Sequence, residues 1–188
     1  MNNIKSKSES QMNEISFKIC LFGDGGVGKT TLTMRYLTGL FKSDTKLTIG
    51  TNFYKKIFSF NENTTISLLI WDFGGEKQFR NLFSKYVAGS NGAIFMYDVT
   101  RFASLTNVDD WMETLKEGLK ENYPVPILMV GSKIDLKEQN KIDTNYPAQV
   151  VNKFNFFDHI LCSAKTGYNV DLIFKRLTEE LMKKLGFV

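Results

Sequence analysis

The sequence predicts an α/β fold, with a six-stranded, mostly parallel sheet covered on both faces by five helices. Short apolar runs of strand length alternate with segments whose apolar residues recur every three or four positions, which is the pattern of a layered α/β domain. Most of these runs are apolar throughout, as parallel strands buried on both faces are. The expected strands cover residues 17–22, 52–60, 65–71, 93–97, 126–130 and 158–161.

The second expected strand differs from the others. Residues 52–60 mix apolar Phe53 and Ile57 with charged Lys55, so one side or one edge of this strand is expected to face water. Residues 61–63, Asn-Glu-Asn, then supply a polar turn. We therefore expect a hairpin that places the second strand antiparallel at the sheet edge.

Helical segments follow the expected strands. A helical run at residues 32–37 comes after the first strand. Apolar stripes at steps of three and four cover residues 105–119 and 170–181, and we expect both to face the core rather than a cofactor. Asn169 is a candidate N-cap of the last helix, and Pro147 suits the first turn of a shorter one.

The composition fits a single globular domain. The chain has 188 residues, of which 43% are apolar and 23% charged, and neither a linker nor a repeat divides it. We expect a flexible polar tail at residues 1–15 and one domain, monomeric, over residues 16–188. The basic residues behind the net charge of +4 are scattered, which argues against a nucleic-acid partner.

Targeting signals are not visible in the sequence. No apolar run approaches the roughly 20 residues that cross a bilayer, and the start lacks the apolar core of a signal peptide. Cys20 and Cys162 lie far apart in apolar runs, where buried thiols are expected. No cysteine near the C-terminus could carry a prenyl group, and Asn2 stands where myristoylation needs Gly. We expect a cytoplasmic protein that contacts membranes only through partners, or through an anchor that lies beyond this sequence.

Residues 23–30, Gly-Asp-Gly-Gly-Val-Gly-Lys-Thr, match G-x-x-x-x-G-K-[ST] between an apolar strand and a helical run. The glycines let backbone N–H groups point inward, and the helix adds its positive N-terminal end, so we expect a phosphate cradle. Lys29 is expected to reach the terminal phosphates and the Thr30 hydroxyl to coordinate Mg²⁺. The alternative, a chance glycine-rich turn, is rare at such a junction. The expected nucleotide contacts of this segment are Asp24, Gly25, Gly26, Val27, Gly28, Lys29, Thr30 and Thr31.

The phosphate loop leaves the base and the reaction open, and four later motifs narrow both. They are TIGTNF at 48–53, WDFGGE at 71–76, GSKID at 131–135 and SAK at 163–165. With these motifs the chain resembles the small GTPases of the Ras superfamily, most closely the Rab branch, from its first strand to its last helix. The resemblance implies the P-loop NTPase fold, GTP and GDP as ligands with Mg²⁺, and work as a molecular switch in signalling and vesicle trafficking.

The first two of these motifs correspond to the family's switch loops. The resemblance implies that Thr48 binds Mg²⁺ through its hydroxyl and the γ-phosphate through its N–H, so that the loop is held only in the triphosphate state. Asp72 would hold Mg²⁺ through a water and complete an oxygen shell with Thr30 and Thr48. Gly75 would offer its N–H to the γ-phosphate.

The last two motifs correspond to the family's guanine site. The resemblance implies that Asp135 accepts two hydrogen bonds from guanine, while the stems of Lys133 and Lys165 cover the faces of the base. The N–H of Ala164 would meet the guanine carbonyl, and Phe41 falls where the family packs an aromatic ring against the base. Adenine would leave the carboxylate unpaired and be rejected. The expected base-binding residues are Phe41, Ser132, Lys133, Asp135, Ser163, Ala164 and Lys165.

The resemblance also implies protein partners at the switch loops: effectors, an exchange factor and a GTPase-activating protein. Phe53, Trp71 and Phe79 resemble aromatic positions that report the nucleotide state to such partners, although plain core or surface aromatics need no such role. As an alternative to the guanine-nucleotide switch, an ATP-using P-loop kinase or ATPase would show itself by binding ATP more tightly than GTP.

Two residues depart from the family pattern. Glu76 stands where most members have the glutamine that orients the attacking water, and its charge opposes the negative charge that develops on the γ-phosphate. We therefore expect slow GTP hydrolysis, although the carboxylate could act as a base or, when protonated, mimic the amide, and Gly25 leaves room for a supplied arginine. A GTP-bound module with negligible turnover is the alternative. Ser132 stands where an asparagine usually bonds the base and braces the phosphate loop. The expected catalytic residues are Lys29, Thr48, Gly75 and Glu76.

Overall fold

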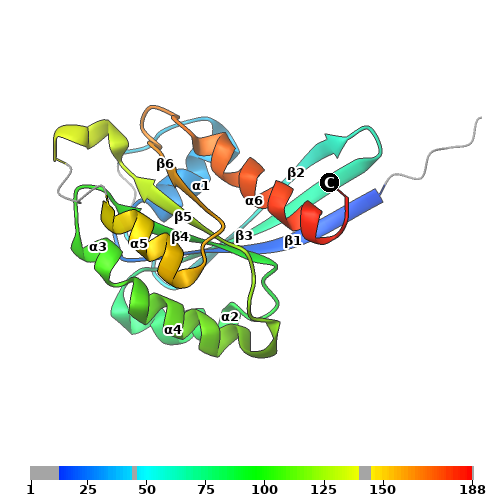
Figure 1. Cartoon of the computed structure of the whole chain (residues 1–188). Helices are drawn as coiled ribbons and strands as arrows, with labels where there is room; N and C mark the ends of the chain where they lie inside the picture. The colour runs from blue at the N-terminus through cyan, green and yellow to red at the C-terminus, as the bar shows by residue number, and fades with distance from the viewer. Residues whose placement is uncertain (1–12, 44–45, 140–144, 188) are drawn as a thin grey trace, which may run out of the picture.

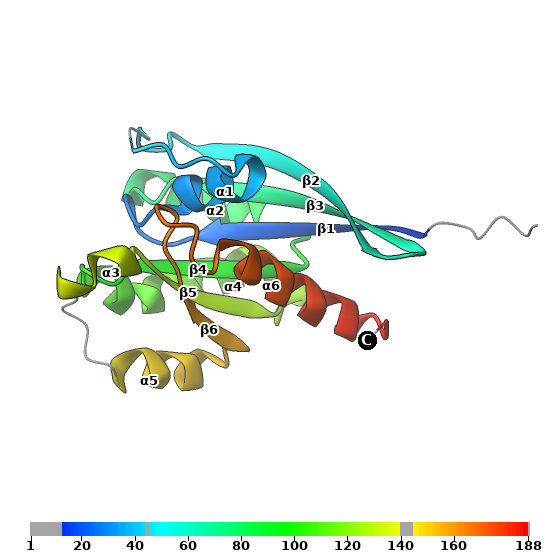
Figure 2. The same ribbon diagram turned by 90° about the horizontal axis from the view of Figure 1, so that it is seen from above.

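A computed structural model describes residues 13–43, 46–139 and 145–187, and it has the predicted α/β architecture (Figure 1). The described strands form one six-stranded sheet in the order β2-β3-β1-β4-β5-β6, which Figure 2 shows from β2 at the top to β6 at the bottom. The strands are β1 (Asn13–Phe22), β2 (Thr51–Asn61), β3 (Thr64–Phe73), β4 (Gly92–Asp98), β5 (Ile127–Ser132) and β6 (Asp158–Leu161).

β2 is the antiparallel edge strand that the sequence predicts, and the other described strands run parallel to their neighbours. In the turn to β3, the N–H of Asn63 donates to Oδ1 of Asn61 at 3.0 Å, a side-chain-to-backbone bond that is typical of Asx turns. Along β2, exposed side chains alternate with partly buried ones, so the expected wet side is confirmed.

β1 begins at Asn13, four residues before the predicted strand. The backbone of Asn13 pairs in register with Thr64 of β3, so residues 13–15 belong to the sheet and not to the expected tail. The polar side chains of Asn13 and Glu14 hid this pairing from the sequence pattern, because ladder bonds use backbone groups alone. The rest of the expected tail, residues 1–12, lies outside the described residues.

The helices cover both faces of the sheet. α1 and α6 pack on one face, while α2, α3, α4 and α5 lie on the other. α3 is a single turn that meets α4 at Asn107, so the two together occupy the place of one expected helix. The helices are α1 (Lys29–Thr38), α2 (Arg80–Tyr86), α3 (Ala103–Thr106), α4 (Val108–Leu119), α5 (Asn145–Phe154) and α6 (Val170–Lys184). No helix in the described part of the chain is long and apolar enough to cross a bilayer.

The apolar stripes face the core, as predicted. Trp111 and Leu115 of α4 are fully buried against one face of the sheet. On the other face, Phe174 of α6 stacks on Tyr36 of α1 with ring centroids 3.8 Å apart. Each face is thus sealed by its own apolar layer, and the carboxyl ends of the strands are left as the place for a ligand.

Asn169 precedes α6 as expected, but it does not cap the helix through its side chain. Its backbone is left-handed, with φ of 57°, a region that Asn tolerates better than most residues. Its side-chain N–H donates instead to the carbonyl of Leu161 at 2.8 Å. The residue therefore fastens the start of α6 to the end of β6.

Candidate functional site

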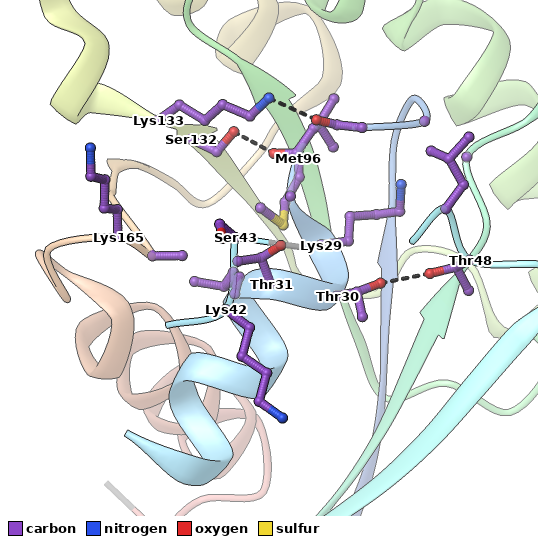
Figure 3. Close-up of a pocket in the computed structure, with 18 of the residues that line it drawn as sticks. Lys29, Thr30, Thr31, Lys42, Ser43, Thr48, Met96, Ser132, Lys133 and Lys165 are labelled. Carbon is purple, nitrogen blue, oxygen red and sulfur yellow. Dashed lines mark hydrogen bonds between the residues drawn. The ribbon is translucent and has the colours of Figure 1, made fainter. Parts of the chain in front are cut away.

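One cavity of about 390 Å³ lies at the carboxyl ends of the parallel strands (Figure 3). Sixteen of the residues predicted from sequence line it, from segments far apart in the chain. Figure 3 places Lys165 and Thr48 at opposite ends of the cavity. The predicted residues that line it are Gly25, Gly26, Val27, Gly28, Lys29, Thr30, Thr31, Phe41, Thr48, Gly75, Glu76, Ser132, Lys133, Asp135, Ala164 and Lys165.

The phosphate loop runs from Gly23 to Gly28 between β1 and α1. Gly28 has φ of 98°, a conformation that side chains with a Cβ rarely adopt. Gly23 approaches β4 so closely that a Cβ atom there would lie 2.1 Å from the carbonyl oxygen of Met96. These positions require glycine, and the loop they form ends at the N-terminus of α1, where backbone N–H groups favour an anion.

Lys29 is the buried cation of this loop. Its Nζ donates to the carbonyl oxygens of Gly23 and Asp24 at 2.7 and 2.9 Å. Burial lowers the pKa of Lys29 to about 8, against the opposing pull of the Asp72 and Asp24 carboxylates. A phosphate in the cavity would supply a full counter-charge to this amine and stabilise its charged form.

Three side-chain oxygen groups meet beside the loop. The Thr30 hydroxyl lies 2.6 Å from the Thr48 hydroxyl and donates to Oδ2 of Asp72 at 2.5 Å. Oδ1 of Asp72 is buried and has no hydrogen-bond partner among the described residues. Burial raises the pKa of Asp72, and the Thr30 hydroxyl and Lys29 oppose that rise. An oxygen-only group with a spare buried carboxylate oxygen fits a hard cation such as Mg²⁺.

The two predicted switch loops touch each other and the phosphate loop. The N–H of Gly74 donates to the carbonyl of Gly50 at 2.8 Å. A Cβ atom at Gly75 would lie 2.2 Å from the backbone nitrogen of Gly25. The backbone of 74–75 is therefore wedged between residues 48–50 and the phosphate loop.

Glu76 lies at the phosphate end of the cavity. A Cβ atom at Gly25 would lie 2.5 Å from Oε1 of Glu76, so the carboxylate occupies the space beside Gly25. From sequence, that space is left open for a water-positioning or supplied group. The structure places the side chain of Glu76 itself there.

Lys133 joins the phosphate loop to β4. Its Nζ donates to the carbonyl of Gly26 at 2.8 Å and pairs with Oδ2 of Asp98 at 2.7 Å. Burial alone would raise the pKa of Asp98, but the bonds from Lys133 and Thr100 hold it below its usual value. These two contacts fix the position of the Lys133 amine. Its methylene stem lines the cavity wall.

The two predicted base motifs are bonded to each other. The hydroxyl of Ser163 donates to Oδ1 of Asp135 at 2.6 Å and accepts from the N–H of Thr166 at 3.1 Å. Ser163 itself does not line the cavity, whereas Asp135, Ala164 and Lys165 do. Ser163 therefore orients the carboxylate that faces the cavity.

Ser132 braces the phosphate loop from β5. Its hydroxyl oxygen lies 2.6 Å from the carbonyl oxygen of Val27 and 2.8 Å from that of Tyr97. A serine hydroxyl has one hydrogen, so these two acceptors share it. The bracing role that the resemblance implies is preserved, and no donor remains on this side chain for a base.

Asp24 does not present its side chain to the cavity. Its carboxylate accepts from Nδ2 of Asn107 at 2.8 Å and from the indole N–H of Trp111 at 2.9 Å. The sequence includes Asp24 among the nucleotide contacts because the motif does, but its carboxylate is committed to the start of α4. Only its backbone is left for a ligand.

Two of the three aromatic residues predicted to report the nucleotide state lie in contact. The rings of Phe53 and Trp71 meet edge to face at 4.4 Å, and Tyr86 lies 6.0 Å from Trp71. Lys18 caps Trp71 with its Nζ 3.9 Å from the ring centroid. Among the described residues, no ring contact joins Phe79 to this group. Tyr86 therefore joins Phe53 and Trp71 in one aromatic group, and the role of Phe79 toward partners stays a prediction.

Sequence motifs missed part of the cavity wall, because most of these residues lie between motifs. Cys162 is next to the SAK motif and is buried, and burial raises the pKa of its thiol to about 12. Both cysteines are buried, as predicted. The other missed lining residues are Leu32, Lys42, Ser43, Lys46, Leu47, Phe73, Met96 and Leu136.

Comparison with known proteins identifies the family. Residues 18–183 match the Ras family model. The chain is 32% identical to Ras-related protein rab-11.1 of Caenorhabditis elegans, over 90% of this chain and 79% of that protein. It is 33% identical to Ras-related protein Rab-13 of Rattus norvegicus, over 90% and 82%. With Ras-related protein Rab-11A of Dictyostelium discoideum it shares 31% identity over 94% and 80%.

The family match spans every strand but the first residues of β1, and it contains the whole cavity. The similarity to the Rab proteins extends over most of both chains, so it is not confined to the phosphate loop that many nucleotide-binding proteins share. The chain therefore belongs to the Ras family and is a small GTPase of the Rab branch.

Proposed function

We propose that this GTPase is a Mg²⁺-dependent guanine-nucleotide switch whose intrinsic GTP hydrolysis is slow. The observation that carries the proposal is that one cavity brings together the phosphate loop, the Thr30–Thr48–Asp72 group, Asp135 and Glu76. The phosphate loop, the three-oxygen group and Asp135 support nucleotide binding. Glu76 supports the slow rate of GTP hydrolysis.

Phosphate binding falls to the loop and Lys29. The backbone N–H groups of residues 25–31 surround the β-phosphate, and Lys29 exchanges its carbonyl partners for phosphate oxygens. The N–H of Gly75 meets the γ-phosphate. Residues 74–75 are then held by two contacts, one with the phosphate loop and one with the γ-phosphate. Loss of the γ-phosphate removes the second of these contacts.

The cation site uses Thr30, Thr48 and Asp72. The hydroxyls of both threonines would serve as direct ligands, and the buried Oδ1 of Asp72 would hold the cation through a water. When bound, Mg²⁺ neutralises charge on the β- and γ-phosphates. Thr48 belongs to the first switch, so this arrangement links metal binding to the position of that loop.

Guanine recognition falls to Asp135. Ser163 holds Oδ1 of this carboxylate, and the two oxygens accept from N1–H and the exocyclic amine of guanine. Phe41, Ala164 and the stems of Lys133 and Lys165 line the same part of the cavity and enclose the base. Adenine offers an acceptor at N1 and no amine at C2, so it would cover the Asp135 carboxylate without giving it the two donors that guanine supplies.

The switch surface presents Phe53 and Trp71 to protein partners. Phe53 is 58% exposed, and it follows directly on the loop that carries Thr48. Effectors, an exchange factor and a GTPase-activating protein would therefore meet a different surface in the GTP and GDP states. We further propose that the protein acts as a monomer in the cytoplasm and contacts membranes peripherally, through partners or through an anchor that lies beyond this sequence.

Slow turnover follows from the carboxylate of Glu76. It can accept a hydrogen bond from the attacking water, but it cannot donate one to the γ-phosphate, and its negative charge lies at the phosphate end of the cavity. The same observation supports a second candidate, a GTP-bound interaction module with negligible turnover.

Phosphate release separates these functions. Protein stripped of nucleotide is loaded with GTP at stoichiometric concentration in the presence of Mg²⁺, and inorganic phosphate is followed over time. Slow release of one phosphate per protein supports the switch, and none over many hours supports the stalled module. Competition of labelled GTP by ATP tests the base assignment, and ATP binding tighter than GTP would overturn it.

A further inference from the structure

Arg101 lies at the phosphate end of the site, outside every motif used above. It sits in the turn between β4 and α3, and its Nη2 donates to the carbonyl oxygen of Gly25 at 2.7 Å. The side chain is exposed and forms no ion pair with any described residue. A cation that rests on the phosphate loop by a single exposed hydrogen bond is free to take a better acceptor.

The backbone of this turn is firmly held. The N–H of Arg101 donates to the carbonyl of Asp98 at 2.9 Å, and its own carbonyl accepts from the hydroxyl of Ser104 at 2.6 Å. Thr100 donates to Oδ1 of Asp98 through both its N–H and its hydroxyl. The Cα of Arg101 is thus fixed beside the phosphate loop, and only its side chain has freedom to move.

Gly25 is the residue that Arg101 and Glu76 share. The guanidinium bonds the carbonyl of Gly25, while the carboxylate of Glu76 lies against the Cα of the same residue. Burial is the main cause of the lowered pKa of Lys29, and the positive charge of Arg101 acts in the same direction. Arg101 therefore lies close enough to Lys29 for its charge to affect the pKa of that amine.

We propose that Arg101 is a positioning residue for GTP hydrolysis: it pairs with Glu76 and holds that carboxylate where it accepts a hydrogen bond from the attacking water. The pair removes the charge opposition that Glu76 otherwise creates beside the γ-phosphate. A planar guanidinium suits this task because it binds a carboxylate through two parallel hydrogen bonds and fixes its orientation.

The proposal rests on the proposed function, and the chemical step is the hydrolysis of GTP. The oxygen of water bonds to the γ-phosphorus, the bond to the β–γ bridging oxygen breaks, and its electron pair leaves with GDP. One proton of the water stays on the oxygen that joins the released phosphate, and the other passes to a phosphate oxygen or to solvent. Arg101 and Glu76 are unchanged at the end.

Single-turnover hydrolysis by Arg101 variants tests the proposal. Arg101→Ala is expected to slow hydrolysis about tenfold with unchanged GDP affinity, and Arg101→Lys to recover part of the loss, because a lysine keeps the charge without the bidentate geometry. Arg35→Ala is the matched control, since Arg35 also donates to a glycine carbonyl, that of Gly39 at 2.6 Å, but on α1. A wild-type rate in Arg101→Ala overturns the proposal.

Double variants decide whether Arg101 acts through Glu76. In a Glu76→Ala background, Arg101→Ala is expected to cause no further loss. The same tenfold loss in that background overturns the proposal, because it would place the guanidinium on the phosphate itself.

A binding measurement keeps the proposal distinct from the proposed function. In protein loaded with a non-hydrolysable GTP analogue and Mg²⁺, the NMR signal of the Arg101 Nε–H is expected to shift in Glu76→Gln. An unshifted signal overturns the pairing even in a protein that hydrolyses GTP. A shifted signal supports the pairing of Arg101 with Glu76, even if the wild type releases no phosphate. Absence of phosphate release would count against GTP turnover, not against the pairing.

Discussion

The hydroxyl of Ser132 lies 2.6 Å from the carbonyl oxygen of Val27 and so fastens the end of β5 to the phosphate loop. Both residues are buried, and the sequence separates them by about a hundred positions. Nucleotide release requires the loop to loosen, so this single bond bears on the rate of release.

Ser132→Ala is expected to speed GDP release. The carbonyl of Val27 loses its donor while it stays buried, and such a loss costs about 1–3 kcal/mol, or about tenfold or more in a rate that depends on loop opening. Stopped-flow release of a fluorescent GDP measures it. Ser67→Ala is the control, because the buried hydroxyl of Ser67 has no hydrogen-bond partner among the described residues. Equal release rates in both variants would contradict the bracing role.

Ser132→Asn addresses the base. A longer amide can reach beyond the loop and donate to the base, so we expect slower GDP release than from the wild type. If the rate of GDP release is unchanged, Ser132 does not set a release rate different from that of family members with asparagine at this position.

Asp135→Asn is expected to change the preferred base. The amide keeps one acceptor for N1–H but puts a donor where the second carboxylate oxygen accepted from the C2 amine, so GTP affinity falls by about a hundredfold. Xanthosine triphosphate, which has a carbonyl at C2, is expected to bind more tightly. Equilibrium competition between the two nucleotides is the measurement. Asp158→Asn removes a carboxylate of β6 that pairs with Arg176 outside the cavity, and it should leave the preference untouched.

Chelation of Mg²⁺ is expected to speed GDP release from the wild type, because Thr30 and Asp72 then lose the cation that joins them to the phosphates, and the Asp72 carboxylate repels those phosphates. In Asp72→Ala, release should be fast from the start and gain little from excess chelator. A large additional gain in this variant would remove Asp72 from the cation site.

Trp111→Phe tests the link between the phosphate loop and α4. Loss of the indole N–H leaves one oxygen of Asp24 without its donor, at a cost of about 2 kcal/mol in the free energy of unfolding. Trp71→Phe changes the same ring type at a partly exposed position and should cost less. Urea unfolding of GDP-loaded protein measures both, and equal losses would deny Asp24 any part in the effect.

The only histidine predicts how stability depends on pH. Nε2 of His159 and the Tyr97 hydroxyl share a hydrogen bond at 2.9 Å, and burial lowers the pKa of His159 below its usual 6.5 despite the nearby Asp158. The unfolded chain therefore binds the proton first. Stability is complete above pH 6.5 and is lost as pH falls through 6.5 toward the folded pKa.

His159→Gln should remove this part of the pH dependence. Urea midpoints of GDP-loaded protein at pH 7.5 and pH 5.5 are compared for both forms, and the ring signals of a single histidine report the folded pKa directly. An unchanged difference between the two midpoints in the variant would assign the effect to other groups.

Local motifs predicted much of the fold and of the cavity. The phosphate loop is predictable because its glycines, Lys29 and Thr30 act within a few residues of one another. The hairpin of β2 and β3 is predictable for the same reason, since a polar turn and an alternating strand are local signals.

Contacts between distant residues could not be predicted in this way. Asp24 meets Trp111 across 87 positions, and Arg101 meets Gly25 across 76. The contact of Tyr86 with Trp71 joins α2 to β3, and no sequence motif includes Tyr86 in that role. These contacts depend on how the elements pack, and the spacing of residues along the chain does not predict that packing.

β2 leaves one row of its backbone groups without a strand partner, since it ends the described sheet. Such an edge can template the addition of another chain and so begin aggregation. On one face of this strand, exposed Lys55 stands between exposed Phe53 and Ile57, so a chain that added along this edge would meet a charge between the two apolar side chains. The strand that leaves Phe53 and Ile57 exposed thus also carries a charge that discourages self-assembly into fibres.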